Sequence, residues 1–322
     1  MRAVQVVRLE GPQGVDIVDL PEPGPSEGKI LVEVHAAGVS FPDLLLSSGQ
    51  YQLKPAPPFT LGVDLAGVVR DAPAGSGFET GDRVAACLPY GGWSDVVSVD
   101  PESVFPLPGN MSYLQGAALP MNYLTAQFAL STRGQLRDGE TVLVHGAAGG
   151  VGTACLQVAK GYGARTIAVV STKEKGDFAA AAGADEVVLL EGFLKSVKDL
   201  TDGRGVDVVV DVVGGDVMTD SLRSLNTLGR VLVVGFTAGH IPEVRVNRLL
   251  LNNTDVRGVG WGGYAMVRPG YMRRQWDELL PMIESGVVNP PVGTTYPLDQ
   301  VRQALTDMAE RRTLGKSVLT FR

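Results

Sequence analysis

A glycine-rich loop is the part of this 322-residue chain whose residue types and spacing point most directly to chemistry. The loop follows the apolar run 141–145 and places Gly149 and Gly152 three positions apart, just before a stretch with helical periodicity. The first glycine lets backbone amides approach a pyrophosphate, the second lets the helix pack closely on the strand, and the helix dipole favours the anion. The loop therefore predicts a dinucleotide site formed by Ala148, Gly149, Gly150, Val151 and Gly152. The alternative is an ordinary glycine-rich turn.

The residues after the next predicted strand indicate which dinucleotide binds. In such sites an acidic residue about 20 positions after the last glycine contacts the ribose 2′-hydroxyl of NAD. Ser171 follows Gly152 by 19 positions, with Thr172 and Lys175 beside it, and no carboxylate takes that place. A serine donor and a lysine charge suit a 2′-phosphate, so the sequence predicts NADPH. The alternative is a solvated helix start with no ligand role.

A third segment follows another predicted strand. Gly235, Phe236 and Thr237 come at the carboxyl end of the apolar run 231–235. Open α/β sheets bind ligands at the carboxyl ends of their strands. We therefore expect backbone groups of this segment to orient the carboxamide of the cofactor.

Signatures of metal and hydrolytic chemistry are missing from the sequence. A structural Cys₄ zinc site needs four thiolates, and the chain has only Cys87 and Cys155. Its three histidines are far apart, and no G-x-S-x-G, H-E-x-x-H or Walker motif occurs. We expect no metal, and a hydride acceptor that is already electrophilic without a Lewis acid.

Two patterns along the chain must position these residues. Up to about residue 123, short β-rich segments alternate with glycine and proline, and from there strands and helices alternate, including a helix over 216–228 and the strand 231–235. Continuous apolar strands separated by helices are typical of a doubly wound parallel sheet. We predict a β-rich domain over 1–123, a nucleotide-binding domain over 124–260, and a return to the first domain over 261–322.

Composition limits the partners of the chain. A formal net charge of −7 and 44% hydrophobic residues describe a folded protein without a broad basic surface, which argues against nucleic acid or an anionic membrane as partner. No apolar run approaches the length of a membrane-spanning helix, and the first residues do not resemble a secretion signal. We expect a cytoplasmic protein.

Five segments together resemble one family. They are 36–43, 58–67, 123–126, 145–152 and 315–319. In this order they are similar to the zinc-independent quinone oxidoreductase branch, which includes zeta-crystallin-like enzymes, of the medium-chain dehydrogenase/reductase superfamily. The resemblance implies a Rossmann sheet inserted in a GroES-like, β-barrel-type catalytic domain. Zinc-dependent relatives have a cysteine at Ser40 and Gly-His-Glu at 62–64, so we interpret Asp64 as a buried hydrogen-bond acceptor, and the alternative is an acid catalyst. We expect Asp43 to cap or pin the following turn.

The same resemblance implies the roles of four further positions. Ser40 would hydrogen-bond the substrate or the carboxamide of the cofactor, although the family often has asparagine there. Tyr51 would line the acceptor pocket or donate a proton, and a simple packing role is the alternative. Thr125 would approach the nicotinamide ring, and Lys316 would reach the cofactor phosphates.

The function that these residues predict is NADPH-dependent reduction of quinones or related activated enones without a metal. One alternative is an enoyl-thioester (acyl-CoA) reductase, and another is a non-enzymatic, crystallin-like NADPH-binding protein. The run 255–260 is a candidate edge strand, and in the family such edges pair between subunits. We therefore expect a homodimer that acts on a small molecule.

Overall fold

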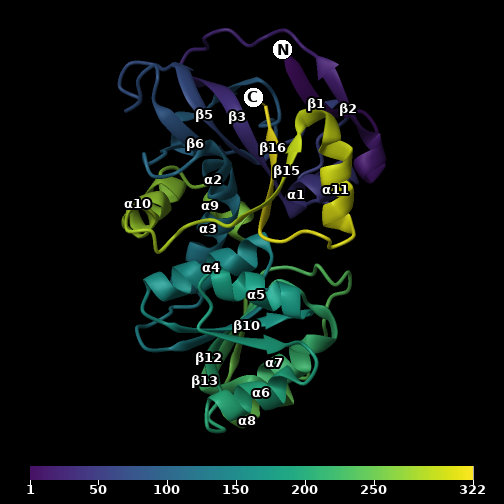
Figure 1. The fold of residues 1–322 in the computed structure, drawn as a ribbon, viewed down its shortest axis with the longest axis vertical. Helices are drawn as coiled ribbons and strands as arrows, with labels where there is room; N and C mark the ends of the chain where they lie inside the picture. Colours follow the sequence, from purple (N-terminus) through teal and green to yellow (C-terminus); the bar gives the residue numbers. More distant parts are fainter. Residues whose placement is uncertain (322) are drawn as a thin grey trace. The chain divides into compact units, whose positions relative to one another are not determined.

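The computed structural model describes residues 1–321, which form two compact units (Figure 1). The first unit comprises Met1–Met121, Pro269–Trp276 and Pro290–Arg322, and the second comprises Asn122–Arg268 and Asp277–Asn289. The second unit therefore interrupts the first in the sequence, and it extends beyond the segment 124–260 that we assigned to nucleotide binding.

The first unit is built on two sheets of short strands. A 7-stranded sheet has the order β15-β16-β3-β5-β6-β8, with β7 paired to β3, and a smaller sheet has the order β2-β1-β4. Val39 on β3 lies opposite Ser317 on β16, so the residue that follows β3 is close to the start of β16. The strands are β1 (Arg2–Val6), β2 (Val15–Asp19), β3 (Ile30–Val39), β4 (Phe59–Thr60), β5 (Asp64–Asp71), β6 (Arg83–Cys87), β7 (Val96–Val99), β8 (Val104–Pro106), β15 (Val292–Pro297) and β16 (Lys316–Thr320).

Few helices accompany these sheets. Helix α1 follows β3 directly, and its first turn is fixed by Asp43, whose carboxylate accepts a hydrogen bond from the backbone N–H of Ser40. This capping places the Ser40 side chain at the end of a rigid strand and at the start of a helix. The helices of the first unit are α1 (Phe41–Ser47), α2 (Tyr113–Ala118) and α11 (Val301–Ala309), while α3 (Pro120–Gln127) and α10 (Tyr271–Glu284) have residues in both units.

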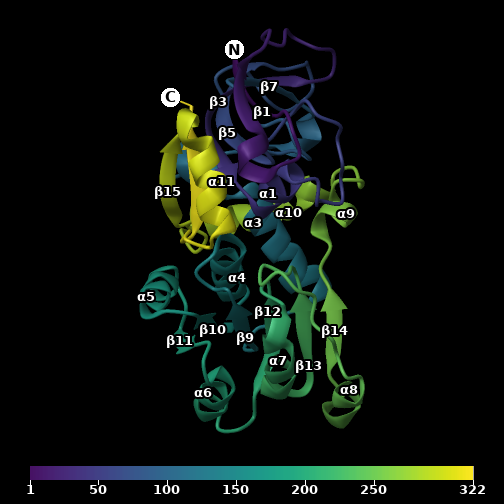
Figure 2. The ribbon, with the colours of Figure 1, turned by 90° about the vertical axis from the view of Figure 1, so that its right-hand side faces the viewer.

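The second unit contains one parallel sheet of six strands in the order β11-β10-β9-β12-β13-β14, and Figure 2 shows them side by side. The chain starts in the middle with β9, builds outward through β10 and β11, and then returns to build the other half from β12. This order is that of a doubly wound dinucleotide-binding sheet, whose ligand crevice lies where the direction of building reverses. The strands are β9 (Thr141–His145), β10 (Arg165–Val170), β11 (Glu186–Leu189), β12 (Val206–Asp211), β13 (Leu225–Val233) and β14 (Asp255–Gly258).

Helices join these strands and bury their side chains. Leu143, Ile167 and Val209 on three neighbouring strands are fully buried in a cluster that also includes Phe193 and Leu222 from the helices. Burial on both faces explains why the strands are continuous apolar runs. The helices are α4 (Gly150–Gly161), α5 (Lys173–Ala181), α6 (Phe193–Leu200), α7 (Met218–Ser224), α8 (Asn247–Asn252) and α9 (Trp261–Ala265). No helix within residues 1–321 is long and apolar enough to cross a membrane.

One predicted boundary in this unit is wrong. We expected a helix over 216–228, but α7 ends at Ser224 and β13 begins at Leu225. Leu228 has a positive φ of 67°, which a helix does not permit. Arg230 is buried and forms an ion pair of 2.6 Å with Glu140, so a contact distant in sequence helps to fix this segment in the sheet.

Candidate active site

The glycine loop connects β9 to α4 at the point where the sheet changes its direction of building. Gly146 has a φ of 63°, and the amide of Gly149 donates to the Gly146 carbonyl at 3.0 Å. A Cβ atom on Gly152 would lie only 2.2 Å from that carbonyl oxygen. Only glycine at this position lets the first turn of α4 approach the end of β9 so closely, which is the packing that the spacing predicts.

A side chain that we did not single out supports the same loop. A Cβ atom on Gly150 would lie 2.5 Å from Nδ2 of Asn122, which is itself 5% exposed. The Thr153 hydroxyl donates to the carbonyls of Gly149 and Gly150, at 3.0 and 3.1 Å. Asn122 thus lies against the beginning of α4, whose first backbone N–H groups are the natural ligands of an anion.

The three residues predicted to select the dinucleotide lie at the same edge of the sheet. Strands β10 and β9 pair in parallel, with Val169 opposite His145, so Ser171 follows β10 at the level of the glycine loop. Thr172 caps α5, and its Oγ1 accepts a hydrogen bond of 3.3 Å from the backbone N–H of Lys175. Since that hydroxyl acts here as an acceptor, its own hydrogen is available to a ligand.

The segment 235–237 is tied to the loop that follows β12. Thr237 donates to the Val212 carbonyl twice, from its backbone N–H at 3.2 Å and from its hydroxyl at 3.1 Å. Asp211, which no motif in the sequence singles out, accepts hydrogen bonds of 2.9 Å from the N–H groups of Val213 and Gly214. Phe236 is 37% exposed. Gly235, Phe236 and Thr237 thus lie on a loop that is fixed by the end of a neighbouring strand.

His145 at the end of β9 is a buried neutral side chain. Its Nε2 lies 2.8 Å from the Ser221 hydroxyl, which donates its own hydrogen to the Val217 carbonyl at 2.9 Å. The histidine is therefore the donor in this pair. Burial lowers the pKa of His145 to about 4, against the opposing effect of Asp211. A serine that is engaged as an acceptor is not a nucleophile activated by histidine.

In the first unit, Ser40 belongs to a buried cluster of charged and polar groups. Nζ of Lys316 forms an ion pair of 2.6 Å with Oδ2 of Asp64 and also donates to Oγ of Ser40. Ser40 Oγ donates to the same Oδ2 at 2.9 Å, and Oδ1 of Asp64 accepts from the backbone N–H of Met121 at 2.7 Å. Asp64 is the buried acceptor that we predicted, whereas the ammonium of Lys316, expected at the cofactor phosphates, has these two side chains as partners.

Asp43 and Tyr51 lie beside this cluster. The Asp43 carboxylate accepts from the backbone N–H groups of Ser40 and Gly62, at 2.8 and 3.1 Å, so it pins the turn as predicted. Burial raises the pKa of Asp43 from 3.8 to about 7. Burial also raises the pKa of Tyr51, and the neighbouring Cys87 and Asp43 raise it further. Tyr51 therefore keeps its proton at neutral pH and can act as a donor.

The catalytic candidates are distributed over both units. Ser40 and Tyr51 belong to the first unit, in which both lie near Asp43. Thr125 belongs to the second unit, on α3, and is 8% exposed.

The cluster in the first unit does not fit a zinc ion. Ser40 and Asp64 hold an ammonium group, and a cationic lysine has no lone pair to offer a metal. Within residues 1–321 there is no group of three or more His, Cys, Asp or Glu side chains that could bind a metal ion.

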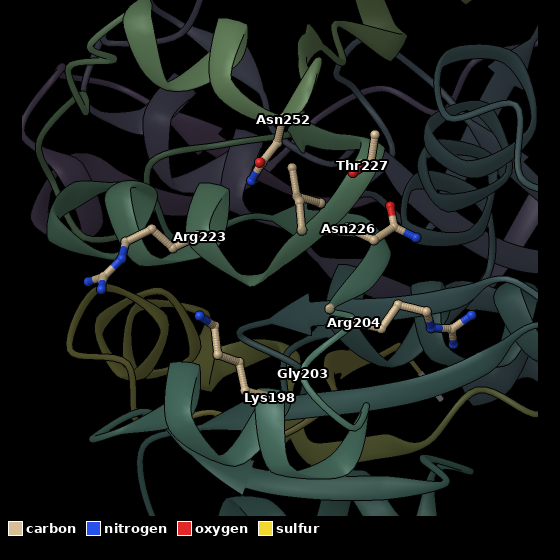
Figure 3. A pocket seen from close by; sticks show the side chains of 9 residues that line it. Lys198, Gly203, Arg204, Arg223, Asn226, Thr227 and Asn252 are labelled. Carbon is tan, nitrogen blue, oxygen red and sulfur yellow. The ribbon is translucent and has the colours of Figure 1, made fainter.

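The lining of a recess of about 220 Å³ in the second unit contains none of the predicted site residues. The recess is found near the amino ends of β12 and β13, and its lining includes Lys198, Arg204 and Arg223. Figure 3 shows that the guanidinium groups of Arg204 and Arg223 point away from each other. The recess therefore does not form a converging anion site.

A parallel sheet built outward from its centre, with a glycine loop leading into a helix at the switch point, defines a dinucleotide-binding unit. Its insertion into a β-rich unit that carries further polar groups is the plan of a two-domain dehydrogenase or reductase. Family models match both parts: an alcohol dehydrogenase GroES-like domain over residues 26–109, and a zinc-binding dehydrogenase domain over residues 150–285.

Comparisons with individual proteins narrow this class. The chain is 37% identical to quinone oxidoreductase-like protein 2 of Rattus norvegicus, over 100% of the chain and 92% of that protein. A probable oxidoreductase from Mycobacterium abscessus is 44% identical, with a TM-score of 0.91 over 99% of this chain and 98% of that one. The quinone oxidoreductase of Escherichia coli complexed with NADPH is 30% identical, with a TM-score of 0.88 over 99% and 100% of the two chains. The chain therefore belongs to the medium-chain dehydrogenase/reductase superfamily, in its quinone oxidoreductase branch.

Proposed function

We propose that this protein is an NADPH-dependent quinone oxidoreductase. The observation that carries the proposal is the close approach of Gly152 to the Gly146 carbonyl, which brings the first turn of α4 to the switch point of the sheet, where a pyrophosphate would bind. The similarity to a quinone oxidoreductase complexed with NADPH over 99% of the chain supports both the cofactor and the acceptor.

On the cofactor side, the loop formed by Ala148, Gly149, Gly150, Val151 and Gly152 would hold the pyrophosphate through its free backbone N–H groups, since the N–H of Gly149 already donates to the Gly146 carbonyl. Ser171, Thr172 and Lys175 would hold the 2′-phosphate, and the backbone of Gly235, Phe236 and Thr237 would orient the carboxamide. When bound, NADPH supplies the hydride. The residues of this chain fix its position, and catalysis rests mainly on orientation in a desolvated site.

On the acceptor side, Ser40 and Tyr51 of the first unit would position the quinone, and Thr125 of the second unit would approach the nicotinamide ring. The raised pKa of Tyr51 keeps its hydroxyl protonated, so the hydroxyl can donate a hydrogen bond, or a proton, to a carbonyl oxygen. We propose that no metal takes part, because an ammonium group holds the oxygen atoms of Ser40 and Asp64.

The test is the oxidation of NADPH with a panel of benzoquinones, naphthoquinones, simple enones and crotonyl-CoA, each with and without a chelator. We expect turnover with quinones that does not change when the chelator is present. Preference for crotonyl-CoA would instead indicate an enoyl-thioester reductase. Binding of NADPH without turnover on any acceptor would indicate a non-enzymatic protein.

Replacement of Lys175 by alanine tests the cofactor preference. Loss of a charge-assisted hydrogen bond to the 2′-phosphate is expected to raise the Kd of NADPH by about 10- to 100-fold and to leave the Kd of NADH nearly unchanged. Lys173→Ala is the matched control, because Lys173 is on the same helix and pairs with Asp177 at 2.9 Å. Equal effects of Lys175→Ala on both cofactors, measured by fluorescence titration, would remove this assignment.

We also propose that the protein is a cytoplasmic homodimer that pairs through β14. Among the described residues, β14 pairs only with β13. Its other edge is therefore open to a strand of a second subunit. Val246, Leu250 and Leu251, around the neighbouring α8, are 75%, 77% and 74% exposed. An open strand edge beside exposed apolar side chains is a typical subunit interface. Light scattering at micromolar concentration is expected to give twice the mass of the chain, and a monomer would contradict this proposal.

The buried Asp43 makes stability depend on pH. Its carboxyl has a pKa of about 7 in the folded protein and about 3.8 as its ordinary value, so folding takes up a proton between these pH values. The contribution of Asp43 to the free energy of unfolding is therefore largest at low pH, and up to ~4 kcal/mol is lost as pH rises toward 7 and above. Asp64 and Lys316, which act on Asp43 with opposite signs, are the neighbouring charges.

His145 has the opposite dependence, because its lowered pKa removes stability as pH falls through the range from 6.5 to about 4. Comparison of the wild type with the Asp43→Asn variant separates the effect of Asp43 from that of His145, because the wild type and the variant both retain His145. Urea unfolding at pH 5 to 8 is expected to show the wild type losing stability relative to Asp43→Asn as pH rises. A difference that does not vary with pH would refute the raised pKa.

A further inference from the structure

In the cluster of Lys316, Ser40 and Asp64, the ammonium group of Lys316 has no catalytic role in the proposed function. Lys316 is 4% exposed, Ser40 is 4% exposed and Asp64 is fully buried. A Cβ atom on Gly38 would lie 2.5 Å from Cε of Lys316, so the glycine leaves room for the lysine chain. The sequence thus brings the ammonium group to the Ser40 hydroxyl through a passage that a larger residue would close.

The direction of the hydrogen bonds follows from the chemistry of the groups. An ammonium group only donates, so Ser40 Oγ accepts from Lys316. The single hydrogen of Ser40 then points to Oδ2 of Asp64, at 2.9 Å. The three groups form a directed chain in which the lysine stands behind the serine oxygen.

The Asp64 carboxylate has hydrogen-bond donors other than the Ser40 hydroxyl. Its Oδ2 also holds Lys316 at 2.6 Å, and its Oδ1 holds the N–H of Met121 at 2.7 Å. When the Ser40 hydroxyl rotates away, both carboxylate oxygens still have a donor. The hydrogen of Ser40 can therefore leave without creating an unpaired buried carboxylate, whose cost would otherwise hold it in place.

We propose that Ser40 is the proton donor to the reduced quinone and that Lys316 restores the proton to Ser40. This inference rests on the proposed function. Hydride addition to a quinone leaves one oxygen as an anion; that oxygen takes the Ser40 hydrogen as the Lys316 ammonium gives a proton to Oγ. Lys316 becomes a neutral amine and regains a proton from solvent after the product leaves. Ser40 is the catalytic residue, and Lys316 acts through it as a positioning residue.

A series of quinones with different substituents tests the relay. Electron-poor quinones give weakly basic anions that need no general acid, whereas electron-rich quinones give basic anions that do. The variants are Ser40→Ala, the charge-balanced double variant Lys316→Met with Asp64→Asn, and Tyr51→Phe. Lys195→Met is the matched control, since the side chain of Lys195 is 86% exposed on α6. NADPH affinity and urea midpoints show which variants are folded.

For electron-rich quinones, Ser40→Ala and the double variant are expected to lower kcat by about 100-fold, and for the most electron-poor quinone by less than about threefold. Ser40→Thr, which keeps the hydroxyl, is expected to restore the wild-type dependence on the quinone, and Lys195→Met to retain it. A uniform loss over the series would show a purely structural role and overturn the relay. A loss confined to Tyr51→Phe would overturn it in favour of tyrosine, and absence of quinone turnover in the wild type would instead contradict the proposed function.

Discussion

Replacement of Lys316 by methionine is expected to lower the free energy of unfolding by about 3 to 5 kcal/mol. Methionine has a similar length and fills the same passage, but it leaves the fully buried Asp64 carboxylate without its cation. An unpaired buried charge is costly because the interior replaces water with a medium of low dielectric constant. Urea unfolding monitored by far-UV circular dichroism measures the change.

The double variant Lys316→Met with Asp64→Asn shows whether the lost stability comes from leaving Asp64 unpaired or from losing the ion pair itself. It removes both charges, and replacing a buried pair as a unit is often close to neutral. We expect the double variant to recover most of the stability that Lys316→Met loses. If Lys316→Met alone unfolds at the wild-type urea concentration, Lys316 does not neutralise Asp64 in solution.

Replacement of Gly152 by alanine is expected to cost about 3 kcal/mol and to abolish measurable NADPH binding. The new methyl group would lie 2.2 Å from the Gly146 carbonyl oxygen, so α4 must move away from β9. This shift displaces the N–H groups that we assign to the pyrophosphate. Thermal unfolding and fluorescence titration with NADPH measure the two effects.

Gly149→Ala is the matched control for this substitution. A methyl group at Gly149 would lie 3.4 Å from the same carbonyl oxygen, which is an ordinary contact, and the backbone φ of −88° suits alanine. We expect this variant to unfold within about 1 kcal/mol of the wild type and still to bind NADPH weakly, because we assign Gly149 to the close approach of the pyrophosphate. If Gly152→Ala binds NADPH as the wild type does, the loop is not the pyrophosphate site.

The parts of the site that depend on local spacing were predictable from the sequence. Gly152 lies in the close contact that the spacing implies, Thr172 caps a helix where we placed the 2′-phosphate site, and β14 is an edge strand. Each of these features is decided by a few neighbouring residues. The alternation of strands and helices was likewise sufficient to predict the parallel sheet, which is present in the second unit.

The parts that depend on distant contacts were not predictable in the same way. Lys316 and Asp64 are separated by 252 positions, and only the pairing of β16 with β3 brings the lysine to the start of α1. Asp211 gave no motif, because its partners are backbone N–H groups of the turn that it organises. The predicted end of α7 was wrong because the buried ion pair of Arg230 with Glu140 outweighs a local helical pattern.

A crystal structure of the protein with NADPH tests the central claim most directly. We expect the pyrophosphate against the backbone amides of 150–152 at the start of α4, and the 2′-phosphate beside Thr172 and Lys175. A dinucleotide bound elsewhere, or crystals that take up no NADPH at saturating concentration, would contradict it.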